Sequence, residues 1–248
     1  MMKEKRMRRI LEFVAQQGAV TAEQIRQEFF VSLPTIYRDL RELMRQNLLT
    51  EEGGRFRRTL EQTVTTPLDF RGSINIEQKK AIAAGAAKLI REHSVIFIDA
   101  STTANHIIDH LTKFEDLTIL TNGLATAMHL KQAGLRTYCV GGELVENSLA
   151  VSGRLAKSML EEFEIDVLLF SAHGVNGAGF IVDPSEKETN LRRYLLKRAA
   201  CSVFLCDSGK FGRNSIFNIA PLRNVDYLVT NAGPHVLDAE VRRRIITV

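Results

Sequence analysis

The stretch VTAEQIRQEFFVSLPTIYRDLRELMRQNLL, residues 20–49, carries the start signals of two helices separated by a tight turn. Thr21 is a good N-cap, and Gln24 follows three residues later, which is the capping-box pattern at the start of a helix. Ser32 is the expected N-cap of a second helix, whose first turn tolerates Pro34. The stretch therefore predicts a short helix, a turn and a second helix.

The second predicted helix separates an apolar face from a polar and basic one. Ile36, Leu40 and Leu43 recur at helical spacing and form the expected buried side. The outer faces carry Thr35, Tyr37, Arg38, Arg41 and Arg45. Two helices joined in this way, the second with an exposed basic face, are the helix-turn-helix arrangement, whose second helix enters the major groove of DNA.

The segments on either side complete a small domain, residues 1–58. A helix is expected over residues 8–17 and is closed by Gly18. LLTEEGGRFRRTL, residues 48–60, predicts a strand, a Gly-Gly turn and a return strand. The arginines of this hairpin, Arg55, Arg57 and Arg58, suit a wing that lies along the DNA backbone. A small helical dimerisation module with a basic edge is the alternative interpretation.

The charge of the chain is concentrated in this first quarter. Residues 1–60 hold 12 lysines and arginines against 8 acidic residues, whereas the other 188 residues hold 21 of each. A basic module attached to a neutral body is typical of a protein that binds nucleic acid.

Three cysteines without any C-x-x-C spacing fit a reducing compartment, and we expect buried, inert thiols because all three lie in apolar stretches. The apolar runs are too short to span a membrane, and the charged N-terminus lacks a signal-peptide core. We therefore expect a cytoplasmic protein that has no membrane partner.

A second domain is expected over residues 76–248, after a threonine-rich linker at 59–75. From residue 77 onward predicted helices alternate with short β-branched runs such as VIFI at 95–98 and SVFLC at 202–206. Among the helices, one is expected over 102–112, one over 153–163 and one over 186–200. This alternation predicts an α/β fold with a parallel sheet covered on both faces.

Polar residues gather where the predicted strands end, which is the edge at which parallel sheets bind ligands. They are Asp99, Ser101, Thr102 and Thr103 after the first strand, Asn122 after the second, Gly142 and Glu143 after the third, and His173 and Lys210 after later ones. The small hydroxyl-rich turn at 101–103 opens a predicted helix, where free N–H groups favour an anion. Hydroxyls, amides and a lysine suit a phosphorylated, polyhydroxylated compound.

Residues 20–49 resemble the N-terminal segment of the DeoR-type (glycerol-3-phosphate-repressor-like) bacterial repressors of sugar metabolism. The recognition helix of that family carries V-S-x-x-T-I-R-R-D-L, and this chain departs from it at Tyr37, where the first arginine is common. Further family patterns appear as DASTT, TNGL, GGE, VSG, HGV, SEKETN and DSGKFGR. The likeness covers nearly the whole chain.

The resemblance implies a winged helix-turn-helix domain followed by a parallel α/β domain similar to the ribose-5-phosphate isomerase and glucosamine-6-phosphate isomerase fold. We expect the side chains that contact double-stranded operator DNA to be Thr21, Ser32, Pro34, Thr35, Tyr37, Arg38, Arg41, Arg55 and Arg57. Ser101, Thr102 and Thr103 are implied phosphate contacts of a sugar-phosphate effector. The residues expected around its sugar are Asp99, Asn122, Gly142, Glu143, Gly153, His173, Glu188 and Lys210. No catalytic residue, metal or cofactor is expected, and DNA half-sites favour a homodimer or homotetramer.

The competing class is a sugar-phosphate isomerase with an appended DNA-binding domain. Asp183, Glu186, Glu188 and Lys210 offer carboxylates and a cation for such chemistry. The acid-rich catalytic loop of those isomerases is not recognisable, and a winged helix has no use in catalysis. A zinc site at HIIDH, residues 106–110, is disfavoured because the zinc-protease pattern needs Glu at the position of Ile107.

Overall fold

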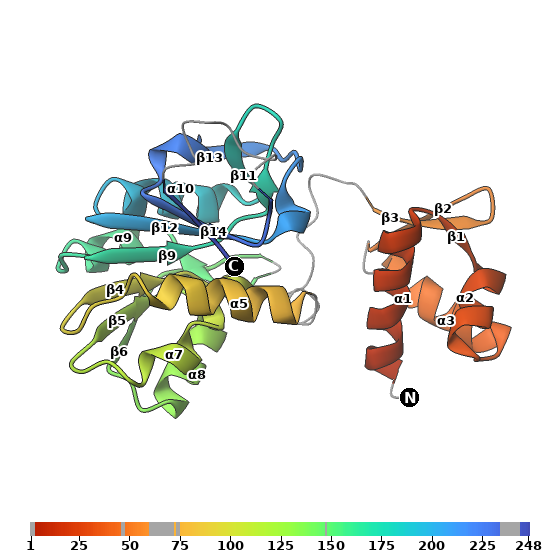
Figure 1. Cartoon of the computed structure of the whole chain (residues 1–248), viewed down its shortest axis with the longest axis horizontal. Coiled ribbons are helices and arrows are strands. Elements are labelled where there is room, and N and C mark those ends of the chain that lie inside the picture. The colour runs from red at the N-terminus through yellow and green to blue at the C-terminus, as the bar shows by residue number, and fades with distance from the viewer. Residues whose placement is uncertain (1–2, 46–47, 60–71, 73–74, 147, 234–243) are drawn as a thin grey trace. The chain divides into compact units, whose positions relative to one another are not determined.

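The computed structural model describes all residues except 1–2, 46–47, 60–71, 73–74, 147 and 234–243, and it divides the chain into two compact units (Figure 1). The first unit comprises residues 1–74 and the second residues 75–248. Most of the expected linker at 59–75 lies outside the described residues. Among those that are described, no helix is both long and apolar enough to cross a membrane.

The first unit contains three helices and a three-stranded antiparallel sheet of order β1-β3-β2. Its elements are α1 (Lys3–Gln17), β1 (Val20–Thr21), α2 (Ala22–Phe29), α3 (Leu33–Arg45), β2 (Leu49–Glu52) and β3 (Arg55–Arg58). The apolar faces of α1, α2 and α3 enclose one core with Leu49 and Phe56 of the hairpin. The unit is the expected winged helix-turn-helix, with Gly53 and Gly54 at positive φ in the hairpin turn.

Helix α1 begins five residues earlier than the pattern predicts. The prediction missed this part of the helix because a charged residue lies on its buried side. Arg6 is buried against Asp39 of α3, with Nε 2.5 Å from Oδ2 and Nη2 3.2 Å from Oδ1. A charge at a helical core position conceals the periodicity from a search for apolar residues. The two-point ion pair therefore joins α1 to the recognition helix.

The second unit is built on a seven-stranded sheet of order β15-β14-β12-β9-β4-β5-β6, and every neighbouring pair in it is parallel. The strands are β4 (Val95–Ile98), β5 (Thr118–Thr121), β6 (Thr137–Cys139), β9 (Val167–Phe170), β12 (Cys201–Cys206), β14 (Tyr227–Thr230) and β15 (Ile245–Thr247). The parallel α/β architecture expected from the sequence is confirmed.

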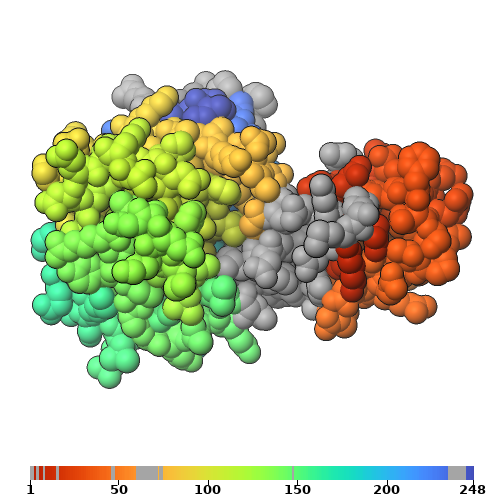
Figure 2. Space-filling view, turned by 90° about the horizontal axis from the view of Figure 1, so that it is seen from below, coloured from red at the N-terminus to blue at the C-terminus, as the bar shows by residue number. Residues whose placement is uncertain are grey.

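Helices cover both faces of this sheet. One face carries α5 (Ile76–Ala87), α6 (Thr102–Asn105), α7 (Ile108–Leu111) and α8 (Leu124–Gln132). Figure 2 views the molecule from this side, with α5, α7 and α8 next to one another in yellow to green. The other face carries α9 (Arg154–Leu160) and α10 (Glu186–Leu196) (Figure 1). Each face has its own apolar core.

Several elements differ from the predictions. The helix expected over 102–112 is divided into α6 and α7, because the amides of His106 and Ile107 donate to carbonyls three residues back rather than four. Helices α9 and α10 end at Leu160 and Leu196, earlier than expected. An antiparallel sheet of β10 (Gly174–Val175), β11 (Phe180–Asp183) and β13 (Phe217–Pro221), a hairpin of β7 (Glu143–Leu144) and β8 (Val151–Ser152), and the third wing strand β1 were not predicted. Strands β1, β7, β8 and β10 have two residues each, which is too short for a recognisable period.

The cysteines do not share one environment, which corrects the expectation of three buried thiols. Cys206 is buried and its burial raises the thiol pKa to about 12, whereas Cys201 is half-buried. Cys139 is exposed, since it lies at the end of β6, the edge strand of the large sheet.

Candidate functional site

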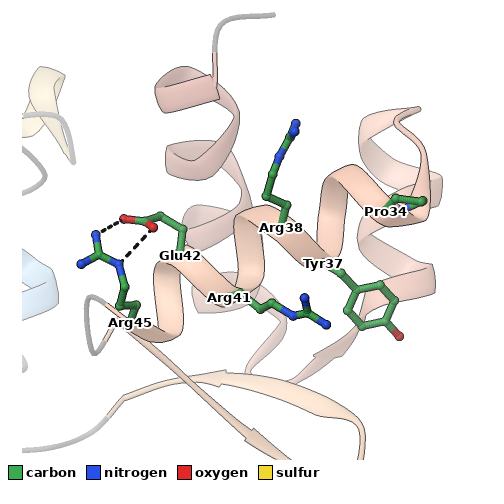
Figure 3. Close-up of a pocket in the computed structure, with 6 residues that line it drawn as sticks. All are labelled: Pro34, Tyr37, Arg38, Arg41, Glu42 and Arg45. Atoms are coloured by element: carbon green, nitrogen blue, oxygen red, sulfur yellow. Dashed lines mark hydrogen bonds and ion pairs between the residues drawn. The ribbon is translucent and has the colours of Figure 1, made fainter.

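The recognition helix α3 presents an open hollow of about 650 Å³ on its outer side (Figure 3). The residues that line it are Pro34, Tyr37, Arg38, Arg41, Glu42 and Arg45. In Figure 3 the Tyr37 ring and the Arg41 guanidinium point to one side of the helix, and Arg38 extends from another. Tyr37, Arg38 and Arg41 are exposed, as contacts to bases and phosphates require.

One arginine of this face is engaged by a neighbouring carboxylate. Arg45 donates from Nη2 to Glu42 Oε1 at 2.6 Å and from Nε to Oε2 at 3.1 Å. Among the described residues, neither Arg38 nor Arg41 has a carboxylate partner in any hydrogen bond or ion pair that we observe. The two guanidinium groups at the centre of the helix are therefore available to DNA.

The hydroxyl residues expected at the DNA face also organise the two helix starts. The Thr21 hydroxyl accepts the amide of Gln24 at 3.2 Å, and Gln24 Oε1 accepts the Thr21 amide at 2.8 Å, which is the predicted capping box. The Ser32 hydroxyl lies 3.0 Å from that of Thr35, and the Ser32 carbonyl accepts the amide of Ile36. These contacts fix the angle at which α3 leaves the turn.

The wing places two of its three arginines on its outer face. Phe56 is buried in β3, so Arg55 and Arg57, its neighbours in the strand, point outward by the alternation of a β-strand. Across the hairpin, Arg55 is opposite Glu52, whereas Arg57 is opposite Thr50. The positive potential of the wing is therefore stronger at Arg57.

In the second unit, Asp99 forms the centre of a buried polar network at the carboxyl end of β4. Its Oδ1 accepts the Ser101 amide at 3.0 Å, and its Oδ2 accepts the Ser171 amide at 3.3 Å. The same Oδ2 accepts Nε and Nη2 of Arg192 at 3.1 and 3.0 Å. Asp99 therefore connects the turns at the carboxyl edge of the large sheet, which we call the polar rim. Its carboxylate accepts hydrogen bonds on both oxygens.

Arg192 on α10 is the partner that the sequence did not reveal. It also donates to Asp183 Oδ2 at 2.9 Å and to Glu188 Oε1 at 3.3 Å. Burial alone would lower the pKa of the Arg192 guanidinium, but the carboxylates of Asp183, Glu188 and Asp99 outweigh it and raise this pKa. Arg192 thus stays charged and links two of the predicted sugar ligands, Asp99 and Glu188.

A second unpredicted cation, Lys79, lies at the hydroxyl-rich turn. Lys79 belongs to α5, is only 4% exposed, and has its Nζ 3.2 Å from the Thr102 hydroxyl. Thr102 itself is half-buried. Nearby His106 is half-buried, and burial first, then the positive charge of Lys79, lowers its pKa. A buried ammonium group therefore faces the turn at which we expect the phosphate.

The other two hydroxyls of the turn lie deeper. The Ser101 hydroxyl caps α6 by accepting the Ala104 amide at 3.2 Å. Thr103 is fully buried, and its hydroxyl has no hydrogen-bond partner in the part of the chain that is described. Because α6 has four residues, its dipole adds little, and the positive charge for an anion comes mainly from Lys79.

Lys210 extends the rim at the end of β12. Its Nζ donates to the Ser171 hydroxyl at 2.7 Å and to the Ala172 carbonyl at 2.9 Å. Because the Ser171 amide also donates to Asp99, Lys210 and the Asp99 network share one residue. His173, two residues further along, is half-buried.

The remaining predicted residues lie around the β7–β8 hairpin. Asn122 is buried, with Oδ1 accepting the Ala100 amide at 3.1 Å and Nδ2 donating to the Val151 carbonyl at 3.1 Å. At Gly142, with φ of 143°, a Cβ would lie 2.5 Å from the Ser152 carbonyl oxygen. Gly153 precedes α9, and Glu143 is exposed and paired with Lys187 at 2.6 Å.

The structure therefore brings Asp99, Ser101, Glu188 and Lys210 into one hydrogen-bonded network, and it connects Asn122 to the same turn through Ala100. Thr102, with Lys79, lies directly beyond Ser101. Glu143 contacts Lys187 instead. No group of three or more His, Cys, Asp and Glu able to hold a metal occurs within the described residues.

Two family models match the two units. Residues 6–59 match the DeoR-like helix-turn-helix domain, and residues 74–232 match the DeoR C-terminal sensor domain. The sensor match alone covers more than half of the chain.

Full-length relatives agree. The glycerol-3-phosphate regulon repressor of Escherichia coli K12 is 31% identical over 228 residues, which are 92% of this chain and 90% of that protein. The transcriptional regulator GolR of Listeria innocua is 32% identical over 91% of this chain and 89% of its own length.

Among solved structures, ribose-5-phosphate isomerase A of Methanocaldococcus jannaschii is similar over 55% of each chain, with 17% identity and a TM-score of 0.42.

Proposed function

This chain belongs to the DeoR family of DNA-binding transcriptional repressors with a C-terminal sensor domain, and we propose that its sensor ligand is a phosphorylated sugar that alters operator affinity and so controls a carbohydrate-utilisation operon. Both matched domains are regulatory, so the isomerase alternative is set aside and the chain is not an enzyme.

The observation that carries the proposal is the buried ammonium group of Lys79 at the Thr102 hydroxyl. A lysine is rarely buried to this extent unless it serves an anion or another polar group. The hydroxyl and amide groups of the neighbouring turn can donate hydrogen bonds to phosphate oxygens. We therefore assign the phosphate to Lys79, Thr102 and the turn at 101–103.

The sugar is assigned to the polar rim beside that turn. Thr102, His173 and Lys210 are half-buried and Glu143 is exposed, so these side chains remain accessible to a ligand. Asp99, Asn122 and Glu188 are buried and hydrogen-bonded, and in this proposal they hold the rim in shape. The name of the Escherichia coli relative, which refers to glycerol 3-phosphate, supports a phosphorylated polyol as the ligand class.

On the DNA side, α3 enters the major groove and the wing follows the backbone. One recognition helix covers one half-site, so the proposal includes a homodimer or homotetramer on repeated half-sites. Residues 59–75 serve as the connection between a DNA-binding domain at 1–58 and a sensor domain at 76–248.

The substitution Thr102→Asp tests the effector part. It places a carboxylate beside Lys79, where it occupies the ammonium group and repels a dianionic phosphate. Thr112→Asp, on the exposed residue at the end of α7, is the matched control.

The measurement is fluorescence anisotropy on a labelled duplex that the wild-type chain has selected from a random library. It is made with and without the sugar phosphate that stabilises the chain most in a thermal-shift panel of glycerol 3-phosphate, ribose 5-phosphate, fructose 6-phosphate and glucosamine 6-phosphate. We expect Thr102→Asp to bind the duplex normally and to ignore the compound. A Thr102→Asp chain that responds like wild type contradicts the phosphate assignment.

A further inference from the structure

Phe30, at the turn between α2 and α3, combines a left-handed backbone with an exposed apolar ring. Its backbone is left-handed, with φ of 53° and ψ of 40°, and its amide donates to the Arg26 carbonyl at 2.9 Å to close α2. A residue with a Cβ is strained in this region, which glycine adopts freely. Burial of the side chain does not offset this strain, because Phe30 is 93% exposed.

The preceding residue, Phe29, shows how an aromatic ring packs in the same unit. Phe29 packs edge-on against Phe13 with ring centroids 6.0 Å apart, and the Arg9 guanidinium lies 5.2 Å from its centroid. Of two adjacent phenylalanines, one is therefore half-buried against the core and the other is exposed to solvent. Backbone strain and a fully exposed apolar ring at one residue together point to a partner outside the unit.

The position of Phe30 indicates which partner this is. It lies three residues before Leu33, the first residue of α3, so its Cα is within about 11 Å of the start of the recognition helix. The N-terminal residues of a recognition helix contact base edges in the major groove. A ring exposed so near that point lies at the wall of the groove when α3 is bound.

We propose that Phe30 is a DNA-contacting residue whose ring packs against the apolar surface of the operator, namely deoxyribose carbons or a thymine methyl group. A phenyl ring has no donor or acceptor, so apolar contact is the only readout it offers. The inference rests on DNA binding by the helix-turn-helix unit and is independent of the effector.

Phe30→Gly separates this role from a purely local one, because the two roles share the predicted effect on stability and differ in the predicted effect on DNA affinity. Glycine relieves the left-handed strain, so the first unit should become more stable, with Tm raised by about 2–6 °C. Loss of the ring should nevertheless weaken specific DNA binding about 5–30-fold. A ring that touches nothing predicts the gain in stability without any loss of affinity.

The experiment uses the full chain and a labelled duplex that the wild-type chain has selected from a random library, with a scrambled duplex for comparison. Kd is measured by anisotropy between 50 and 200 mM salt for wild type, Phe30→Gly and the ring-retaining control Phe30→Tyr. Because an apolar contact releases no counterions, Phe30→Gly should weaken binding at every salt concentration and leave the slope of log Kd against log salt unchanged. Phe30→Tyr should bind within about threefold of wild type.

Two results would overturn the proposal. One is a Phe30→Gly chain that binds the selected duplex as tightly as wild type. The other is a Phe30→Gly chain whose salt slope falls as it does when an arginine is removed, since that shows displaced phosphate contacts. Failure of the wild-type chain to select any duplex would contradict DNA binding itself.

Discussion

Lys79 gives the sharpest test of the effector site, because the residue beside it is a matched control. Lys79 is 4% exposed and contacts Thr102, whereas Lys80 is exposed and lies 3.5 Å from Glu77, one turn back on α5. Lys79→Met keeps the apolar stem and removes the ammonium group. Lys80→Met makes the same chemical change on the solvent side of the same helix.

The magnitude follows from the contact. A hydrogen bond to a charged group contributes about 1.5–3 kcal/mol, and the phosphate also loses its buried counter-charge. We expect a loss of about 2–3 kcal/mol in effector binding, which is about 30–150-fold in Kd. At a sugar-phosphate concentration of about 100 times the wild-type Kd, bound ligand stabilises the wild-type chain by about 2.7 kcal/mol. This should raise Tm by about 5–11 °C in wild type and by about 1–3 °C in Lys79→Met.

A thermal-shift assay measures the change in Tm, and calorimetric titration measures Kd. Both use the sugar phosphate that the panel identifies. Lys80→Met should behave like wild type. The reasoning is refuted if Lys79→Met binds within about threefold of wild type, or if both lysine variants lose affinity equally.

The DNA-binding unit allows three further tests. Asp39→Ala removes the carboxylate that the buried Arg6 contacts and should destabilise the unit by about 3–5 kcal/mol. Glu42→Gln, at an exposed pair, should change stability by less than about 1 kcal/mol. Urea unfolding of both variants compares them, and equal losses would argue against a structural ion pair. Arg57→Ala should reduce the slope of log Kd against log salt by about 1 and weaken binding to all DNA sequences similarly. Arg55→Ala should have a smaller effect, because Glu52 lies opposite Arg55 in the hairpin. A larger effect of Arg55→Ala would contradict the wing orientation. Arg38→Ala should cost about 1–3 kcal/mol on the selected duplex and relax its sequence preference, and unchanged selectivity in a binding-site selection would mean that α3 is wrongly placed.

The parts of the fold that were predicted are those specified by local signals. The capping box at Thr21, the spacing of Ile36, Leu40 and Leu43, and the Gly-Gly turn each act over a few residues, and all are present in the structure. The alternation of short apolar strands with helices likewise predicted the parallel sheet. Local chemistry was enough to establish both architectures.

The missed features depend on partners far apart in the sequence. Arg6 pairs with Asp39 across 33 residues, and Arg192 pairs with Asp99 across 93. From the sequence alone, a charged residue on a helix is best assigned to solvent, and only its partner explains its burial. Lys79 was missed for the same reason, since EQKK resembles a solvated turn of helix. The one available signal was its helical spacing with Ile82 and Ala86, which are buried in α5.

The central claim is that a sugar phosphate bound in the sensor domain changes the affinity of the full chain for its operator. The most direct measurement is the Kd for the selected duplex at fixed salt, with and without a saturating amount of the sugar phosphate that gives the largest thermal shift. We predict a change of about 5–150-fold, the usual range of coupling between two sites, and its loss in Lys79→Met. A sugar phosphate that binds the chain and leaves this Kd unchanged would contradict the account.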